Sequence, residues 1–375
     1  MEYKRLGDYI REVNVRNREL TVTILLGLSI EKKFIPSIAN TIGTDMSSYK
    51  IVQPSQFAYV PVTSRNGDKI TVALYDGEES VIISQAYTIF EIVDKDLLLP
   101  EYLMMWFRRP EFDRYARFHS HGSAREVFDW DELCNVMLPV PDIARQREIV
   151  SEYATLTNRI RLNEQMIANL EATAQALYRK MFVDGVDKEN LPEGWRRGHL
   201  TDIATYLNGI ACQKYETKEE SYLPVLKIRE LSQGHCDDNS DHVETTIPKE
   251  YVINNGDVIF SWSATLFIDF WCGGRCALNQ HLFKVTSEKY PKWYYYLWTQ
   301  YHIAEWKRLI SAKATSMGHI KREDLELAEV IIPSSSSMKE YDEIMSPIFD
   351  IYIQKKQENL RLTELQSLLL ARMGK

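Results

Sequence analysis

The sequence lacks the features of secreted and membrane proteins. Its five cysteines are irregularly spaced along 375 residues, which argues against a disulfide framework and favours a reducing compartment. The charged N-terminus has no apolar core of the kind found in signal peptides. No run of about 18 apolar residues is present to span a membrane. We therefore expect a soluble, cytoplasmic protein with no membrane partner.

The motifs of common enzymes are also missing. There is no phosphate-binding loop ending in Gly-Lys-Ser/Thr, no Gly-x-Gly-x-x-Gly and no His-Glu-x-x-His. The Asn/Asp-Pro-Pro-Tyr/Phe segment of amino-methyltransferases does not occur. Cys272 and Cys276 have the wrong spacing for a zinc knuckle, so we interpret both as ordinary loop or core residues. We expect no catalytic residue, no metal and no cofactor in this chain.

What the sequence does contain is an internal repeat. Leu133 and Leu325 are 192 residues apart, and Trp106 matches Trp298 at the same offset, which holds without a gap as far as Met181 and Met373. Near the start of each copy the offset shifts slightly, as loop insertions would produce. The alternative is chance similarity between amphipathic segments, but the matches keep their order over nearly the whole chain.

Each copy begins with a part of mixed character. Short β-rich runs occur at 69–74, 80–83, 86–92 and 257–261, and helical stretches at 101–118 and 291–310. This pattern predicts a mixed α/β (α+β) fold. We place the boundaries of the two domains at 1–142 and 185–333.

Each copy ends in a long helix, predicted over 143–184 and 334–375. Apolar residues in the first follow a heptad spacing of alternating fours and threes. In the second, Pro347 predicts a kink or a late helix start. The seam residues that we expect to matter most are Leu156, Ile160, Asn163, Ile167, Leu170 and Leu177, followed by Ile348, Lys355, Leu362 and Leu369 in the second helix.

Two such helices in one chain bury their seams most simply against each other, since each buried side chain contributes roughly 1.5–3 kcal/mol. An antiparallel pair would put the two domains at opposite ends, related by a pseudo-twofold axis. Asn163 and Lys355 take equivalent polar positions, which would either set the helix register or face solvent at the seam edge. An external helical partner could also use these helices.

Local basic clusters stand against a net charge of −8. Such a charge argues against a polycation that coats nucleic acid, but it does not exclude local contacts. These clusters either contact DNA or form solvated helix faces. The cluster of the first copy contains Arg108, Arg109, Arg114, Arg117 and Arg125, and that of the second copy contains Lys307, Arg308, Lys313, Lys321 and Arg322.

Several segments resemble one family. Residues 162–184, LNEQMIANLEATAQALYRKMFVD, closely resemble the central conserved region of type I restriction–modification specificity subunits, and Leu191–Trp195 resembles the start of their second target-recognition domain. Residues 54–59, 256–263 and 277–283 look like strand segments of such domains. The resemblance covers almost the whole chain. The second helix is less regular, and the chain is somewhat short.

The resemblance implies a non-catalytic subunit of a restriction enzyme and adenine-N6 methyltransferase complex. Each recognition domain would read one half of a bipartite double-stranded DNA target. The antiparallel helices would set the spacer and dock two methyltransferase subunits, and restriction subunits would join them. S-adenosylmethionine, ATP and Mg would then belong to the partners.

Within such domains we expect DNA contacts from loop side chains that hydrogen-bond bases or phosphates. The candidates in the first domain are Arg65, Asn66, His119, His121, Ser123 and Arg125. Those in the second domain are Lys227, Arg229, Trp262, Ser263, Gln280, His281, Lys313, Thr315, Ser316, His319 and Lys321. The alternatives are a coiled-coil scaffold without DNA binding and a stand-alone methyltransferase, the latter disfavoured by the missing motifs.

Overall fold

The computed structural model of the chain describes residues 2–37, 43–64, 67–122, 125–312 and 320–374. It divides into two compact units. Unit 1 contains Met1–Arg159 and Leu362–Lys375, and unit 2 contains Ile160–Arg361. Each unit therefore combines one mixed segment with parts of both long helices. No helix in these described ranges is long and apolar enough to cross a membrane.

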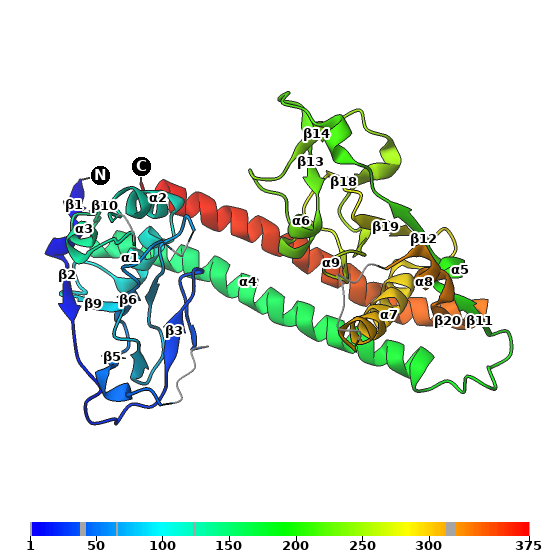
Figure 1. Ribbon diagram of the computed structural model, residues 1–375, viewed down its shortest axis with the longest axis horizontal. Coiled ribbons are helices and arrows are strands. Elements are labelled where there is room, and N and C mark those ends of the chain that lie inside the picture. The colour runs from blue at the N-terminus through cyan, green and yellow to red at the C-terminus, as the bar shows by residue number, and fades with distance from the viewer. Residues whose placement is uncertain (1, 38–42, 65–66, 123–124, 313–319, 375) are drawn as a thin grey trace. The chain divides into compact units, whose positions relative to one another are not determined.

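Unit 1 consists of short strands and helices (Figure 1). Its strands are β1 (Tyr3–Arg5), β2 (Ile10–Val13), β3 (Leu26–Leu28), β4 (Phe34–Pro36), β5 (Lys50–Val52), β6 (Phe57–Tyr59), β7 (Val72–Leu74), β8 (Val81–Ile83), β9 (Thr88–Ile92) and β10 (Met137–Pro139). Its helices are α1 (Pro100–Phe107), α2 (Pro110–Phe118), α3 (Trp130–Cys134) and the first part of α4 (Ile143–Tyr178).

The main sheet of unit 1 has the antiparallel order β2-β9-β6-β7. Phe57 and Phe90 pair across it and stack at 4.9 Å between ring centroids, with Phe107 of α1 edge-on to both. The chain between 101 and 118 forms two helices rather than the single stretch expected. The break falls at Arg109, which is extended (φ −71°, ψ 136°), because the residue before a proline disfavours the helical conformation.

Unit 2 has a similar set of elements. Its strands are β11 (Arg196–His199), β12 (Thr205–Asn208), β13 (Tyr222–Leu226), β14 (His242–Glu244), β15 (Val252–Ile253), β16 (Val258–Ser261), β17 (Phe267–Phe270), β18 (Cys276–Leu278), β19 (Leu282–Thr286) and β20 (Glu329–Ile332). Its helices are α5 (Leu200–Ile203), α6 (Ile228–Gln233), α7 (Lys292–Ala312), α8 (Arg322–Leu327) and most of α9 (Ser335–Arg372).

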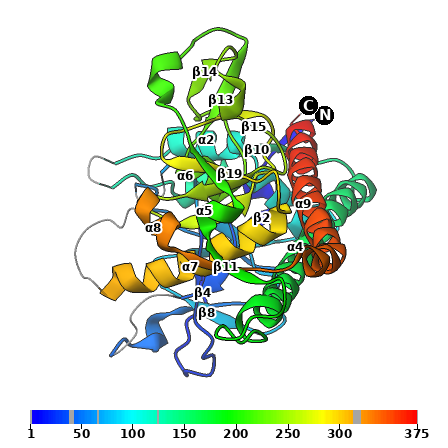
Figure 2. The same ribbon diagram turned by 90° about the vertical axis from the view of Figure 1, so that its right-hand side faces the viewer.

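The main sheet of unit 2 has the order β12-β19-β16-β17, which is the order of unit 1 with each strand replaced by its counterpart in the second copy. Likewise, β1 pairs with β10 in unit 1, and β11 pairs with β20 in unit 2. A further sheet, β14-β13-β18-β15, belongs to unit 2. Its strands β13 and β14 lie away from α7 and α8 in both views (Figures 1 and 2).

Both long helices bury the heptad seam that the sequence predicts. Along α4 within unit 2, Ile160, Asn163, Ile167 and Leu170 are buried or half-buried, whereas the residues between them are exposed. Along α9, Ile348, Lys355, Leu362 and Leu369 are half-buried, as are Leu156 and Leu177 of α4. A π-helical turn, Arg179–Val183, extends α4.

Within unit 2, α4 and α9 contact each other, and residue numbers rise along one helix where they fall along the other. Asn163 Nδ2 donates to Asn359 Oδ1 at 2.9 Å, and the Phe182 ring lies 5.5 Å from that of Tyr341. Asn163 is only 2% exposed, so the solvent-facing interpretation of this residue is wrong. A buried amide pair of this kind favours one register, because any slip leaves both amides unpaired.

Of the two alternatives predicted at Pro347, a kink or a late helix start, the late start is wrong. Helix α9 begins at Ser335, well before Pro347, and continues through it. Met345, Phe349 and Tyr352, which flank the proline, are nearly fully buried in the core of unit 2. Their burial offsets the cost of about 3 kcal/mol for a proline inside a helix.

In unit 1, the opposite ends of the two helices meet. Gln366 Nε2 donates to Thr157 Oγ1 at 2.7 Å, and Leu370 and Met373 join the domain core beside Ile149. The Tyr3 hydroxyl donates to the Gly374 carbonyl at 2.9 Å. The last turn of α9 is therefore anchored in the same unit as the first strand, and the two chain ends appear together in Figure 1.

Candidate nucleic-acid interface

In unit 1, three of the predicted contact residues lie around the end of α2. His119 stacks on Tyr115 at 4.2 Å, and its Nδ1 lies 3.0 Å from Glu132 Oε2. His121 pairs through its backbone with Val127 and is exposed, as is Arg125. His119 is thus held in place, whereas His121 and Arg125 present open side chains. Arg65, Asn66 and Ser123 lie outside the described residues.

The arginines of the first cluster differ from one another. Arg109 is 7% exposed, and its guanidinium lies 4.2 Å from the centroid of the Trp106 ring. Arg117 Nη1 donates to the Gly67 carbonyl at 2.5 Å, whereas the Arg114 side chain is 71% exposed. Arg109 is therefore a structural cation, and Arg114 is the most accessible of these three.

In unit 2, Lys227 and Arg229 are both held by carboxylates. Lys227 Nζ bonds Asp241, and Arg229 Nη2 donates to Asp237 Oδ1 at 2.8 Å. Arg229 also contacts Glu230, which is 1% exposed. The guanidinium lowers the pKa of Asp237 to about 2. These ion pairs fix the loop after α6, so DNA would have to compete with them for either cation.

Four further candidates lie at two neighbouring turns of unit 2. Trp262 follows β16, and its ring lies 6.1 Å from that of His281, which precedes β19. His281 is exposed, and Gln280 is half-buried, with its backbone N–H donating to the Ile210 carbonyl at 2.9 Å. Ser263 is only 4% exposed. The protein covers this side chain, which would have to become exposed to make the predicted DNA contact.

A hollow of about 750 Å³ brings Trp262 together with Lys321. Lys321 precedes α8 and is exposed, and its backbone N–H donates to Asp324 Oδ2 at 2.7 Å. The hollow is lined by Thr201, Thr205, Tyr206, Asn208, Tyr251, Phe283 and Arg322, among others. The remaining candidates of this region, Lys313, Thr315, Ser316 and His319, lie outside the described residues.

Sequence reasoning missed most of this hollow. Tyr206, Asn208 and Phe283 come from β12 and β19, which were not singled out as contact strands. The available signal was the two-residue alternation of Tyr206 with Asn208 and of Phe260 with Trp262, which puts each pair on one face of a strand. What the sequence could not supply was the pairing of β12 with β19 and of β19 with β16.

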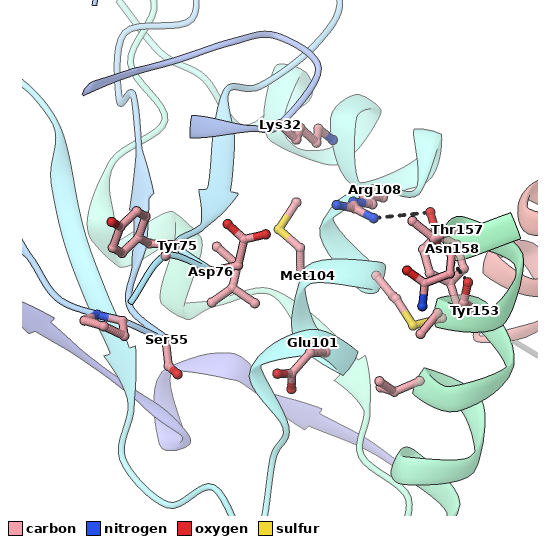
Figure 3. A pocket seen from close by; sticks show the side chains of 16 residues that line it. Lys32, Ser55, Tyr75, Asp76, Glu101, Met104, Arg108, Tyr153, Thr157 and Asn158 are labelled. Atoms are coloured by element: carbon pink, nitrogen blue, oxygen red, sulfur yellow. Dashed lines mark hydrogen bonds between the residues drawn. The ribbon is translucent and has the colours of Figure 1, made fainter. Parts of the chain in front are cut away.

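A second hollow, of about 460 Å³, lies in unit 1 between the sheet domain and α4 (Figure 3). Arg108 Nη1 donates to the Tyr153 hydroxyl at 3.4 Å, and Lys32 lies above Arg108 in the view of Figure 3. Asp76 and Glu101 also line this hollow. Because cations and carboxylates face the same space, no ligand of one charge is favoured there.

Cys272 and Cys276 are part of the core, which agrees with their interpretation as ordinary loop or core residues. Cys272 and Cys276 are both buried, and burial raises the pKa of the Cys272 thiol to about 11. In the parts of the chain that the structure describes, no three His, Cys, Asp or Glu side chains are grouped as a metal site.

Two units of the same topology, joined by long helices and carrying polar and aromatic turns, agree with a protein that reads nucleic acid. Residues 192–364 match the family described as type I restriction modification DNA specificity domain. Over these residues the chain is therefore similar to that family.

Individual proteins are similar to the chain over more of its length. The chain is 23% identical over 303 residues to the type I restriction enzyme MjaIX specificity subunit of Methanocaldococcus jannaschii, covering 75% of this chain and 70% of that protein. It is 20% identical to the HindI specificity subunit of Haemophilus influenzae, covering 98% and 97%. The crystal structure of an S subunit from M. genitalium has the same fold, with a TM-score of 0.60, 10% identity, and coverage of 100% and 96%.

Proposed function

We propose that this chain is a type I restriction–modification specificity subunit that reads a bipartite DNA target, with one half-site for each recognition domain, at 1–142 and 185–333. The observation that carries this proposal is the repeated topology. Two units with the same sheet order, β2-β9-β6-β7 and β12-β19-β16-β17, suit two half-sites of one duplex. Side chains that differ between the two units would then contact different bases.

The long helices, 143–184 and 334–375, form in this proposal an antiparallel coiled coil that acts as the spacer. Support comes from the opposite numbering at both contacts, Asn163 with Asn359 and Thr157 with Gln366. Shifting the first pair by the repeat offset of 192 relates Asn163 to Lys355 and Asn359 to Ile167, which are again seam residues. This exchange is what a pseudo-twofold axis through the helix pair would produce.

The same helices offer a surface for partners. Leu162 and Met166 on α4, and Ile344 and Ile351 on α9, are apolar side chains that are 41–50% exposed. We infer that two methyltransferase subunits dock on the helices and that restriction subunits join them in the cytoplasm. S-adenosylmethionine, ATP and Mg would act in those partners and not in this chain.

The net charge of −8 suggests that the methyltransferase partners supply much of the phosphate contact, and this can be tested. The chain alone is expected to bind duplex DNA weakly, and addition of its methyltransferase partner is expected to restore tight binding. If the complex contacts six or more phosphates, its affinity should fall by about a thousandfold or more between 50 and 200 mM salt. Fluorescence anisotropy with a labelled duplex measures both quantities.

Two results would contradict this account. Tight binding by the chain alone would show that the partner is not needed for phosphate contact. Absence of salt-dependent binding even in the assembled complex would favour the coiled-coil scaffold, which the family match does not favour.

A further inference from the structure

The hollow of unit 2 has an aromatic surface built on one face of its main sheet. Phe283 of β19 pairs with both Asn208 of β12 and Phe260 of β16, so these side chains share a face. Tyr206 and Trp262 lie two residues from Asn208 and Phe260 and therefore share it too. The ring of Phe283 lies 6.1 Å from that of Tyr206 and 5.8 Å from that of Trp262.

These rings are only partly used by the core. Phe260 is fully buried and stacks against Trp306 of α7 at 6.2 Å, which closes the inner end of the row. Tyr206, Trp262 and Phe283 are half-buried and line the hollow. We call these three residues the aromatic platform. A row of partly open rings on a sheet face is the arrangement on which unpaired bases stack in nucleic-acid-binding domains.

The rim of the hollow is polar and cationic. Lys321 and Arg322 are exposed at the start of α8, and the Arg322 guanidinium is 3.4 Å from Glu326. Asn208, which accepts from Trp262 Nε1 at 3.3 Å, presents an exposed amide. Cations suit a phosphate, and an amide suits the polar edge of a base. An apolar peptide would gain nothing from this rim.

We propose that this hollow binds one unpaired nucleobase of DNA, stacked on the aromatic platform. The proposal rests on the DNA-recognition function and adds how unit 2 carries it out. A paired base shows only its edge in a groove, so use of a ring face requires that the base leave the stack. The volume of about 750 Å³ lies within the range of ligand-binding clefts.

The described residues of unit 1 do not form such a platform. The counterpart of Phe260 in unit 1 is Tyr59, which pairs with Thr88, whereas Phe260 pairs with Phe283. Two residues after Tyr59 the chain has Pro61, whereas two residues after Phe260 it has Trp262. The platform is therefore not needed to build the shared fold. Its presence in one unit alone points to a role in reading one half-site.

The test compares a fully paired labelled duplex with the same duplex carrying one central unpaired thymine, at low salt. The full-length chain is used alone, so that no methyltransferase pocket competes for the base. We expect the duplex with the unpaired thymine to bind about tenfold more tightly. Trp262→Ala and Phe283→Leu should each abolish that preference.

Matched controls separate stacking from loss of fold. Trp262→Phe keeps a ring face and should keep the preference, as should Phe118→Ala, which removes an aromatic side chain that is 80% exposed in unit 1. Phe283→Leu preserves apolar volume and decides the matter if Trp262→Ala unfolds unit 2. Equal binding of both duplexes, or a preference that survives Phe283→Leu, would overturn the proposal. Neither result would affect half-site reading, which is tested by domain exchange.

Discussion

Lys32→Met is expected to lower the free energy of unfolding of unit 1 by about 3–5 kcal/mol. The Lys32 side chain is only 6% exposed, and its Nζ bonds Asp113 Oδ1 at 2.7 Å as well as the Phe107 carbonyl. Burial lowers the pKa of this ammonium although Asp113 acts to raise it. Methionine would leave the Asp113 carboxylate, 13% exposed, without its counter-charge.

A second variant shows whether the loss comes from that stranded charge. Asp113 also accepts from the Ile70 backbone N–H at 3.1 Å, and asparagine keeps such an acceptor. We therefore expect Lys32→Met with Asp113→Asn to recover at least half of the lost stability in urea denaturation. If the double variant is no more stable than Lys32→Met alone, the buried ion pair is not the cause.

The second large effect is expected from shortening both long helices by one heptad. Deletion of 157–163 from α4 together with 359–365 from α9 removes the Asn163–Asn359 pair along with both flanking segments. Seven residues are close to two turns, so the seam faces are kept. Each helix loses about 10 Å, which is about three base pairs of DNA at 3.4 Å each. The tolerated spacer should shorten by that amount.

The matched control removes four residues from each helix instead of seven. Four residues shift the heptad out of phase and disrupt the seam, so methylation should be lost at every spacer. Both variants are scored by the methylated sites in cells that also express the methyltransferase partner. An unchanged spacer in the seven-residue variant would rule out the helices as a ruler.

The helices were the most predictable part of the fold. A heptad seam needs only the spacing of apolar residues along one segment, and Ile160, Ile167 and Leu170 are half-buried as that spacing predicts. Pro110 also carried a local signal, since the residue before it disfavours a helix. The late helix start predicted at Pro347 does not occur, because tertiary packing favours the helix there. The burial of Met345 and Phe349 cannot be read from neighbours in the sequence.

The candidate site was less predictable, because its contacts join distant segments. Arg229 looked like a free cation, yet Asp237 reaches it from the loop after α6. Ser263 looked like a turn hydroxyl, yet the structure covers it. Trp262 and Lys321 were both chosen from the sequence, but nothing in it shows that they line one hollow. That information lies in strand order, which local patterns do not encode.

The central claim is that the two domains read two half-sites independently. The most direct measurement replaces residues 1–142 with the corresponding domain of a known specificity subunit and maps methylated adenines in the host genome. The account predicts a new sequence in one half of the motif, with the other half and the spacer unchanged. A change in both halves, or in neither, would contradict it.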